Sequence, residues 1–204
     1  RVQFGDGSEL TIPELIALAG SALIIDPQEM NNHIAGSNGN DVVYGEGGND
    51  TLAGGDGDDI LNGGAGNDIL TGGTGSDIYL FGKDSGQDMI DSEDTTAGKI
   101  DSVLFDDGIT PDQVSVSRSG SDLILALIGT SDTLTIRNYL ENDGINTFAV
   151  EQIRFNEDGV IWDPATIKTK LESNRAPELS IALPDQKATK GNIFNYTVAP
   201  DTFA

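Results

Sequence analysis

The sequence predicts an all-β fold whose central part is a regular solenoid. Two observations carry this prediction. Residues 36–80 repeat with a period of nine, and short internal repeats of this kind are typical of stacked coils. Residues 92–172 then read as short strands in which apolar and polar residues alternate, as expected for strands with one buried face.

The five consecutive repeats share four fixed positions; from Gly36 they read GSNGNDVVY, GEGGNDTLA, GGDGDDILN, GGAGNDILT and GGTGSDIYL. Positions 1 and 4 are always Gly, position 6 is always Asp, and position 8 is always large and apolar. Glycine suits the tight six-residue turn because it adopts positive φ without steric cost. The short strand that follows points its middle side chain inward. We therefore expect an apolar column made of Val43, Leu52, Leu61, Leu70 and Tyr79.

The position-6 aspartates indicate a bound cation. Two repeats complete one coil, so repeats two apart superpose at the sheet spacing of about 4.8 Å, and their acids enter the same gap. Carboxylates repel there unless they share a cation such as Ca²⁺, which takes about 6–8 oxygen ligands. Residues 36–91 carry a formal charge of −10, which four Ca²⁺ would bring to roughly −2. Because so thin a core cannot offset the backbone entropy of folding, we expect cation binding to contribute to folding.

The composition excludes several partners and sites. A formal net charge of −23 over 204 residues argues against binding to nucleic acid, whose phosphates need a basic surface, and against an anionic membrane surface. The absence of cysteine excludes disulfides and zinc–thiolate sites. No apolar run is long enough for membrane insertion. A single histidine leaves no hydrolytic triad, and we therefore expect no enzyme activity.

The nonapeptides resemble the RTX (repeats-in-toxin) family, also called haemolysin-type calcium-binding repeats; the repeated pattern GGxGxD followed by an apolar strand carries the resemblance. The resemblance implies a parallel β-roll in which each calcium lies between turn n and turn n+2. It also implies the ligands. The first turn gives the carbonyls of positions 2 and 4 and its Asp, and the second turn gives the carbonyls of positions 1 and 3 and its Asp.

Carried onto this chain, the resemblance implies about 3–4 Ca²⁺. One site would use Ser37, Gly39 and Asp41 with Gly54, Asp56 and Asp59. A second would use Glu46, Gly48 and Asp50 with Gly63, Ala65 and Asp68. A third would use Gly55, Gly57 and Asp59 with Gly72, Thr74 and Asp77. A fourth would set Gly64, Gly66 and Asp68 against Ser85 and Asp88, in a degenerate sixth repeat whose Asp spacing stretches from nine to eleven residues.

Two features of the early repeats depart from this pattern. Ser37 and Glu46 replace glycine at position 2, which puts the backbone angles of these turns in question but not their carbonyl ligands. Upstream, Asn32 stands where an Asp belongs and Ile34 falls on the apolar column. Asparagine lacks the charge of a carboxylate, so we expect no full site there. His33 is expected to be an exposed strand residue.

We expect four segments along the chain. Residues 1–35 would be the end of a preceding module with a lead-in strand, 36–91 the calcium-binding β-roll, 92–172 a β-rich capping domain with a terminal helix, and 173–204 a linker with the truncated start of a cadherin- or immunoglobulin-like domain. Strands are expected within 99–105, 113–118, 121–128, 133–140 and a hairpin at 150–162 turned at Asp158-Gly159. Alternation predicts that their buried residues include Val103, Phe105, Leu123, Leu125, Leu127, Ile153 and Phe155.

The N-terminus resembles a second copy of the end of this capping domain. Phe4 corresponds to Phe155, Asp6-Gly7 to Asp158-Gly159, and Leu10 to Trp162. Each copy is expected to be a hairpin followed by a short helix. The sequence begins at Arg1 and not at Met, and we interpret the chain as an excerpt from a longer protein that contains such modules in tandem.

Three functions fit these features. We favour a non-catalytic calcium-binding module of a secreted or bacterial cell-surface protein of the adhesin type, for which the resemblance implies type I secretion and folding outside the cell. Its partners would be calcium ions, neighbouring modules of the same chain and a host-surface or glycan ligand. One alternative is a calcium-dependent carbohydrate- or ice-binding module. The other is the secretion and folding tail of a secreted hydrolase or similar enzyme.

Overall fold

The computed structural model describes residues 2–3, 9–10, 22–25, 30–91, 93–141 and 150–174. The expected start of a cadherin-like domain, from residue 175 onward, and the expected N-terminal helix lie outside the described residues. Within them, strands predominate, with one α-helix, α2 (Pro164–Ser173), and a 3₁₀ turn at Pro111–Gln113. No helix in this part of the chain has the length and apolarity that a membrane crossing needs.

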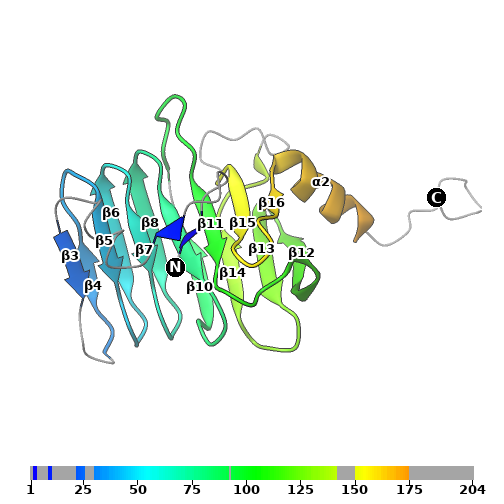
Figure 1. The fold of residues 1–204 in the computed structure, drawn as a ribbon, viewed down its shortest axis with the longest axis horizontal. Coiled ribbons are helices and arrows are strands. Elements are labelled where there is room, and N and C mark those ends of the chain that lie inside the picture. The colour runs from blue at the N-terminus through cyan, green and yellow to red at the C-terminus, as the bar shows by residue number, and fades with distance from the viewer. Residues whose placement is uncertain are drawn as a thin grey trace, which may run out of the picture.

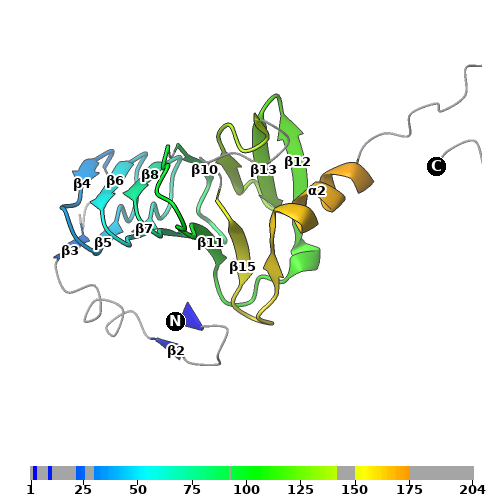
Figure 2. The same cartoon turned by 90° about the horizontal axis from the view of Figure 1, so that it is seen from above.

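Two seven-stranded sheets face each other along the molecule (Figures 1 and 2). The first sheet runs β3 (Ala22–Ile25), β5 (Asp41–Tyr44), β7 (Ile60–Asn62), β9 (Ile78–Phe81), β11 (Ser102–Phe105), β15 (Gln152–Phe155), β16 (Ile161–Trp162). The second runs β4 (His33–Ala35), β6 (Thr51–Asp56), β8 (Ile69–Thr74), β10 (Gln87–Ile90), β14 (Thr133–Ile136), β13 (Asp122–Leu127), β12 (Val114–Ser119). From β3 to β11 the chain alternates between the two sheets, as a solenoid must.

Repeats two apart pair in parallel, as the nine-residue period predicts. Val43 lies opposite Leu61 between β5 and β7, and Leu52 lies opposite Leu70 between β6 and β8. The turns also stack, because isolated parallel bridges join Asn38 to Asp56 and Gly47 to Ala65. The predicted parallel β-roll is therefore confirmed.

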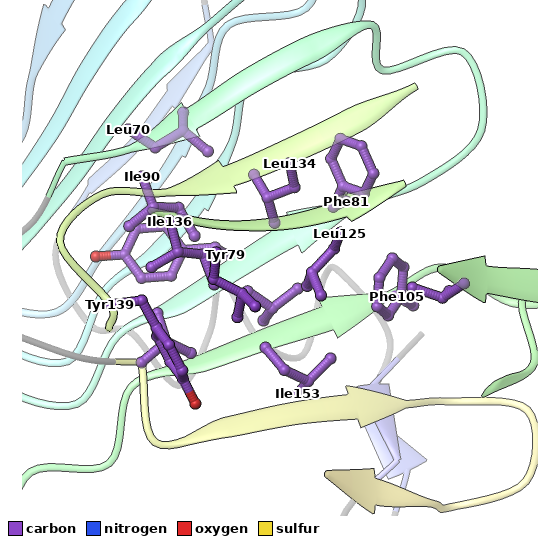
Figure 3. Close-up of a cluster of buried hydrophobic side chains, with 14 of the residues drawn as sticks. Leu70, Tyr79, Phe81, Ile90, Phe105, Leu125, Leu134, Ile136, Tyr139 and Ile153 are labelled. Atoms are coloured by element: carbon purple, nitrogen blue, oxygen red, sulfur yellow. The ribbon is translucent and has the colours of Figure 1, made fainter. Parts of the chain in front are cut away.

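The position-8 residues form the predicted apolar column between the sheets. Their side chains are fully buried: Val43, Leu52, Leu61, Leu70 and Tyr79. Ile34 extends the column upstream, while His33 beside it is exposed, as predicted. Figure 3 shows Leu70 and Tyr79 close to Ile90 and Ile136, where the column passes into the region after the repeats.

The strands after residue 92 extend the two sheets of the roll and share its core. Strand β11 pairs in parallel with β9, and β14 pairs in parallel with β10, so both sheets continue across the boundary expected at residue 91. One hydrophobic cluster runs from Ile34 to Ile167. All the predicted inward residues of this region are buried: Val103, Phe105, Leu123, Leu125, Leu127, Ile153 and Phe155. The antiparallel strands β12 and β13 continue one sheet, and β16 ends the other.

The two hairpins noted in the sequence have the same register. Strand β1 (Val2–Gln3) pairs antiparallel with β2 (Glu9–Leu10), with Val2 opposite Leu10. In the later hairpin Ile153 lies opposite Trp162. Val2 stands two residues before Phe4, and Ile153 stands two residues before Phe155. Residues that correspond in the sequence therefore form corresponding pairs in the two hairpins.

Candidate metal centre

The position-6 aspartates lie in two buried columns, one along each sheet. We call them the first acid column (Asp41, Asp59, Asp77 and Asp101, preceding or beginning β5, β7, β9 and β11) and the second acid column (Asp50, Asp68 and Asp88, preceding or within β6, β8 and β10). None of these residues is more than 3% exposed. The degenerate sixth repeat keeps the register of the column. The backbone N–H of Asp68 donates to Asp88 Oδ1 across twenty residues, where the regular repeats make the same bond across eighteen.

Each column aspartate except Asp41 uses its Oδ1 oxygen to bind the preceding coil. The backbone N–H of Asp41 donates to Asp59 Oδ1 at 2.8 Å, and that of Asp59 donates to Asp77 Oδ1 at 2.9 Å. In the second acid column the N–H of Asp50 donates to Asp68 Oδ1 at 2.7 Å. Oδ1 therefore faces back, toward the turn two repeats earlier.

One carboxylate oxygen is buried and has no hydrogen-bond partner in each of five aspartates: Oδ2 of Asp50, Asp59, Asp68 and Asp77, and Oδ1 of Asp41. Burying an ionised carboxylate without compensation is costly, because the charge loses its hydration. A series of such oxygens, repeated at every coil, is the arrangement that a set of bound cations would compensate.

In Asp50 and Asp59 the unpaired oxygen, Oδ2, faces forward, toward a carbonyl of the following coil, whereas the forward oxygen of Asp41 is the Oδ2 that accepts from Ser37. A methyl group on Gly45 would collide with both Asp50 Oδ2 and the carbonyl oxygen of Gly63. A methyl group on Gly54 would collide in the same way with Asp59 Oδ2 and the carbonyl oxygen of Gly72. A carboxylate oxygen and a carbonyl oxygen thus lie on either side of the space that a Cβ would fill. This accounts for glycine at position 1. Two such oxygens are also suitable ligands for a cation that prefers oxygen, such as Ca²⁺.

The remaining predicted carbonyl ligands lie in the same stacked turns. The position-3 carbonyls of Ala65, Thr74 and Ser85 accept hydrogen bonds of 2.8–3.0 Å from the position-4 N–H groups two turns earlier. The position-2 carbonyls of Ser37 and Glu46 accept from the N–H groups of Asp56 and Ala65 at 3.2 and 2.8 Å. A carbonyl oxygen with one hydrogen bond keeps a second lone pair. Across the described residues no three acidic or histidine side chains converge on one point, so a cation here must take further ligands from the backbone.

The two departures from the repeat pattern have different consequences. Glu46 adopts a φ of 67°, the left-handed conformation that glycine would adopt more easily. Ser37 is not in that region; its N–H and its hydroxyl both donate to Asp41 Oδ2, at 2.5 and 2.8 Å. The first turn therefore contains one carboxylate oxygen already engaged by a side chain, unlike the later turns.

Burial raises the pKa of five column acids: Asp59, Asp68, Asp77, Asp88 and Asp101. Desolvation is the largest cause in each case and raises the pKa of Asp59 to about 6, of Asp77 to about 7 and of Asp88 to about 8. The backbone N–H bond from the preceding coil acts in the opposite direction, and neighbouring acids raise the pKa further. In the absence of a cation, several of these carboxylates would therefore hold protons near neutral pH.

Two acids in line with the first acid column cannot be found from the repeats: Asp101, its last member, and Glu151, which lies beyond it. Asp101 lies opposite Asp77, and Glu151 lies opposite Asp101, although neither belongs to a nonapeptide. The signal in the sequence is an acid two residues before an inward strand residue, Val103 or Ile153, as Asp59 precedes Leu61. The loss of the nine-residue spacing hides this signal.

The profile of the family described as "RTX calcium-binding nonapeptide repeat (4 copies)" matches residues 29–61, 44–79 and 53–90. Residues 29–90 are RTX calcium-binding repeats. The profile described as "Haemolysin-type calcium binding protein related domain" matches residues 122–166, within the region that continues the two sheets of the RTX roll. Calcium is thus the cation that this repeat family binds, in agreement with the oxygen-only donor set.

The chain is also similar to one curated relative and one solved structure. The chain is 38% identical over 96 residues to "Iron-regulated protein FrpA" of Neisseria meningitidis serogroup C, a match that covers 47% of the chain and 8% of FrpA. The chain thus spans a small part of the length of this relative. The solution structure of the AlgE6R3 subunit of the Azotobacter vinelandii mannuronan C5-epimerase is 23% identical, with a TM-score of 0.41, over 83% of this chain and 95% of that one.

Proposed function

We propose that this chain is a non-catalytic structural module that folds on calcium in a secreted or bacterial surface protein. The observation that carries the proposal is the series of buried, unpaired carboxylate oxygens that face the next coil. Calcium would be held at four sites, each named by its two aspartates: Asp41 with Asp59, Asp50 with Asp68, Asp59 with Asp77, and Asp68 with Asp88. The carbonyls predicted from the repeat pattern would complete each site.

Calcium would supply the free energy that the thin core lacks. A ligand at ten times its dissociation constant stabilises the folded state by about 1.4 kcal/mol per site. The metal also removes the repulsion within the columns and the cost of burying their charges. Sites of millimolar affinity are empty in the cytosol and filled outside the cell. This difference supports folding after export.

A non-catalytic role is supported by where the titratable groups lie. The column acids with raised pKa values are buried between stacked turns, where a substrate has no access. His33, the only histidine of the chain, is exposed on β4. The acids therefore serve to bind metal and not to transfer protons to a substrate.

A place in a tandem array is supported by the two hairpins of matching register, Val2 with Leu10 and Ile153 with Trp162. The first hairpin would end one module and the second would end the next. Neighbouring modules of the same chain would then be the direct partners of this one. The parent protein would be secreted, or held at the surface of a bacterial cell.

Circular dichroism during a calcium titration of the 204-residue chain tests the proposal. We expect a coil-like spectrum in chelator, a gain of β signal at about 10⁻⁴–10⁻³ M Ca²⁺, and little gain with Mg²⁺, which requires a tighter octahedral site. A roll that keeps its β signal after exhaustive chelation at neutral pH would contradict calcium-driven folding.

A further inference from the structure

The first acid column continues past the last site that the repeats define. Asp77 Oδ1 faces back and accepts the N–H of Asp59, so this oxygen belongs to the gap already assigned to Asp59 and Asp77. Asp77 Oδ2 is buried and has no hydrogen-bond partner. A methyl group on Gly72 would collide with it, although here the hydroxyl of Tyr79 lies where Gly45 and Gly54 face a carbonyl of the next coil. Because Oδ1 faces back, Oδ2 faces the next gap, between residues 72–77 and the segment that ends at Asp101.

Asp101 forms the opposite wall of that gap. It lies in register with Asp77, and its Oδ1 accepts the N–H of Asp77 at 3.0 Å. This is the same bond that joins Asp59 to Asp77 at 2.9 Å one coil earlier. The gap is thus bounded by two aspartates in the same relative positions as in the RTX sites, although Asp101 lies outside the repeats.

Asp94 supplies an oxygen where the repeats use a carbonyl. In the turn before, the N–H of Gly57 donates to the position-3 carbonyl of Thr74. In this gap the equivalent N–H, that of Gly75, donates to Asp94 Oδ2 at 3.3 Å. Asp94 is 2% exposed. A carboxylate oxygen therefore occupies the place of a carbonyl that the repeat pattern uses as a metal ligand.

We propose a fifth calcium site in this gap, formed by Asp77 Oδ2, Asp94 and Asp101. The carbonyls of Gly73 and Gly75 would complete it, because their turn repeats the backbone of the turn two repeats earlier. Gly73 and Gly75 have φ angles of 115° and 123°, against 123° and 125° for Gly55 and Gly57. The three carboxylates do not converge on one point in the structure, so calcium would draw Asp94 toward Asp77 and Asp101. A third carboxylate would raise the calcium affinity through its added charge.

The column of metals ends at this site because the next gap contains an internal cation. The ammonium of Lys99 lies 2.9 Å from Asp101 Oδ2 and 2.9 Å from Glu151 Oε1. The N–H of Asp101 donates to Glu151 Oε2 at 2.6 Å, which continues the pattern of the column. The forward oxygen of Asp101 is therefore paired with Lys99, whereas that of Asp77 is left for a metal.

Native mass spectrometry of the whole chain in calcium tests the site by counting bound ions. The four repeat sites and the fifth site together give five ions, and Asp94→Ala should give four. Glu93→Ala is the matched control, because it removes one exposed acid from the neighbouring position and should still give five. Trp162 fluorescence, from the single tryptophan, shows that each variant is folded. An unchanged count in folded Asp94→Ala would overturn the fifth site.

Asp77→Asn provides a second count that does not depend on Asp94. It should lose two ions, one from the site shared with Asp59 and one from the fifth site, whereas Asp41→Asn should lose one. Loss of a single ion in Asp77→Asn would overturn the fifth site and leave the four repeat sites standing. A wild-type chain that binds no calcium would overturn the proposed function as well. If Asp94→Ala does not fold, Asp94→Asn keeps an oxygen for Gly75 but lacks the charge. As calcium is lowered, it should lose one ion at a higher calcium concentration than Glu93→Gln does.

Discussion

The backbone N–H of Asp41 donates to the carboxylate of Asp59 at 2.8 Å, across eighteen residues of the chain. This bond fixes the acid of one turn beneath the turn two repeats earlier. It occupies one carboxylate oxygen and directs the other toward the following coil. Asp59 therefore faces two gaps, whereas Asp41 stands at the start of its column.

We expect Asp59→Ala to weaken calcium-driven folding more than Asp41→Ala. Asp59 would contribute to two sites and Asp41 to one, and each site lost removes about 1.4 kcal/mol at calcium ten times above its dissociation constant. The calcium midpoint from circular dichroism should rise in both variants, and further for Asp59→Ala. Equal midpoints would contradict the sharing of aspartates between repeats n and n+2.

Lowering the pH should stabilise the folded β-roll when calcium is absent. The folded-state pKa values of Asp59, Asp77 and Asp88, about 6, 7 and 8, lie above the ordinary value of 3.8. The folded state therefore binds more protons than the unfolded state between those values, and its stability rises as the pH falls. The free-energy cost of burying these ionised carboxylates is fully present above about pH 8, and it diminishes as the pH falls through about 8, 7 and 6.

Circular dichroism of the metal-free chain between pH 9 and pH 5 measures this effect, with β signal expected to increase at the acid end. With calcium present the dependence should reverse, because protons compete with the metal for the same carboxylates. Asp77→Asn and Asp88→Asn should each reduce the gain in metal-free acid. Further loss of β signal on acidification of the metal-free wild type would contradict the raised pKa values.

Gly54→Ala should prevent the roll from closing around its metal. The added methyl group would occupy the space shared by Asp59 Oδ2 and the carbonyl of Gly72. Gly129→Ala is the control, because Gly129 has a φ of 89° but open space around its Cα. That change should cost only the strain of a left-handed residue, about 1–2 kcal/mol. Thermal unfolding at saturating calcium should show a much larger loss for Gly54→Ala.

Lys99→Met should destabilise the region after the repeats. The ammonium is nearly fully buried and pairs with Asp101, which is 1% exposed, and with Glu151. Removing one partner of a buried ion pair leaves an uncompensated charge and costs about 3–5 kcal/mol. Chemical unfolding followed by Trp162 fluorescence measures the cost. Lys168→Met, at an exposed position on α2, should leave the transition within experimental error.

The repeated sequence by itself determined the coil, its apolar column and the acids in its turns. Each nonapeptide carries its own glycines, its inward residue and its aspartate, so a local rule applied five times gives the register of Leu52 on Leu70 and of Asp41 on Asp59. The inward faces of the later strands were also predicted, because alternation is a local property as well. Phe105 and Phe155, which stack at 5.0 Å between ring centroids, are an example.

Only the tertiary structure decided which distant residues join the columns. Asp101, Glu151 and Lys99 meet because β11 and β15 pair on the sheet of the roll, across separations of up to fifty-two residues. Irregular segments between these strands remove the nine-residue spacing, so no pattern in the sequence places them together. Sheet pairing does so, because an added strand buries its inward face and satisfies its backbone only in one register.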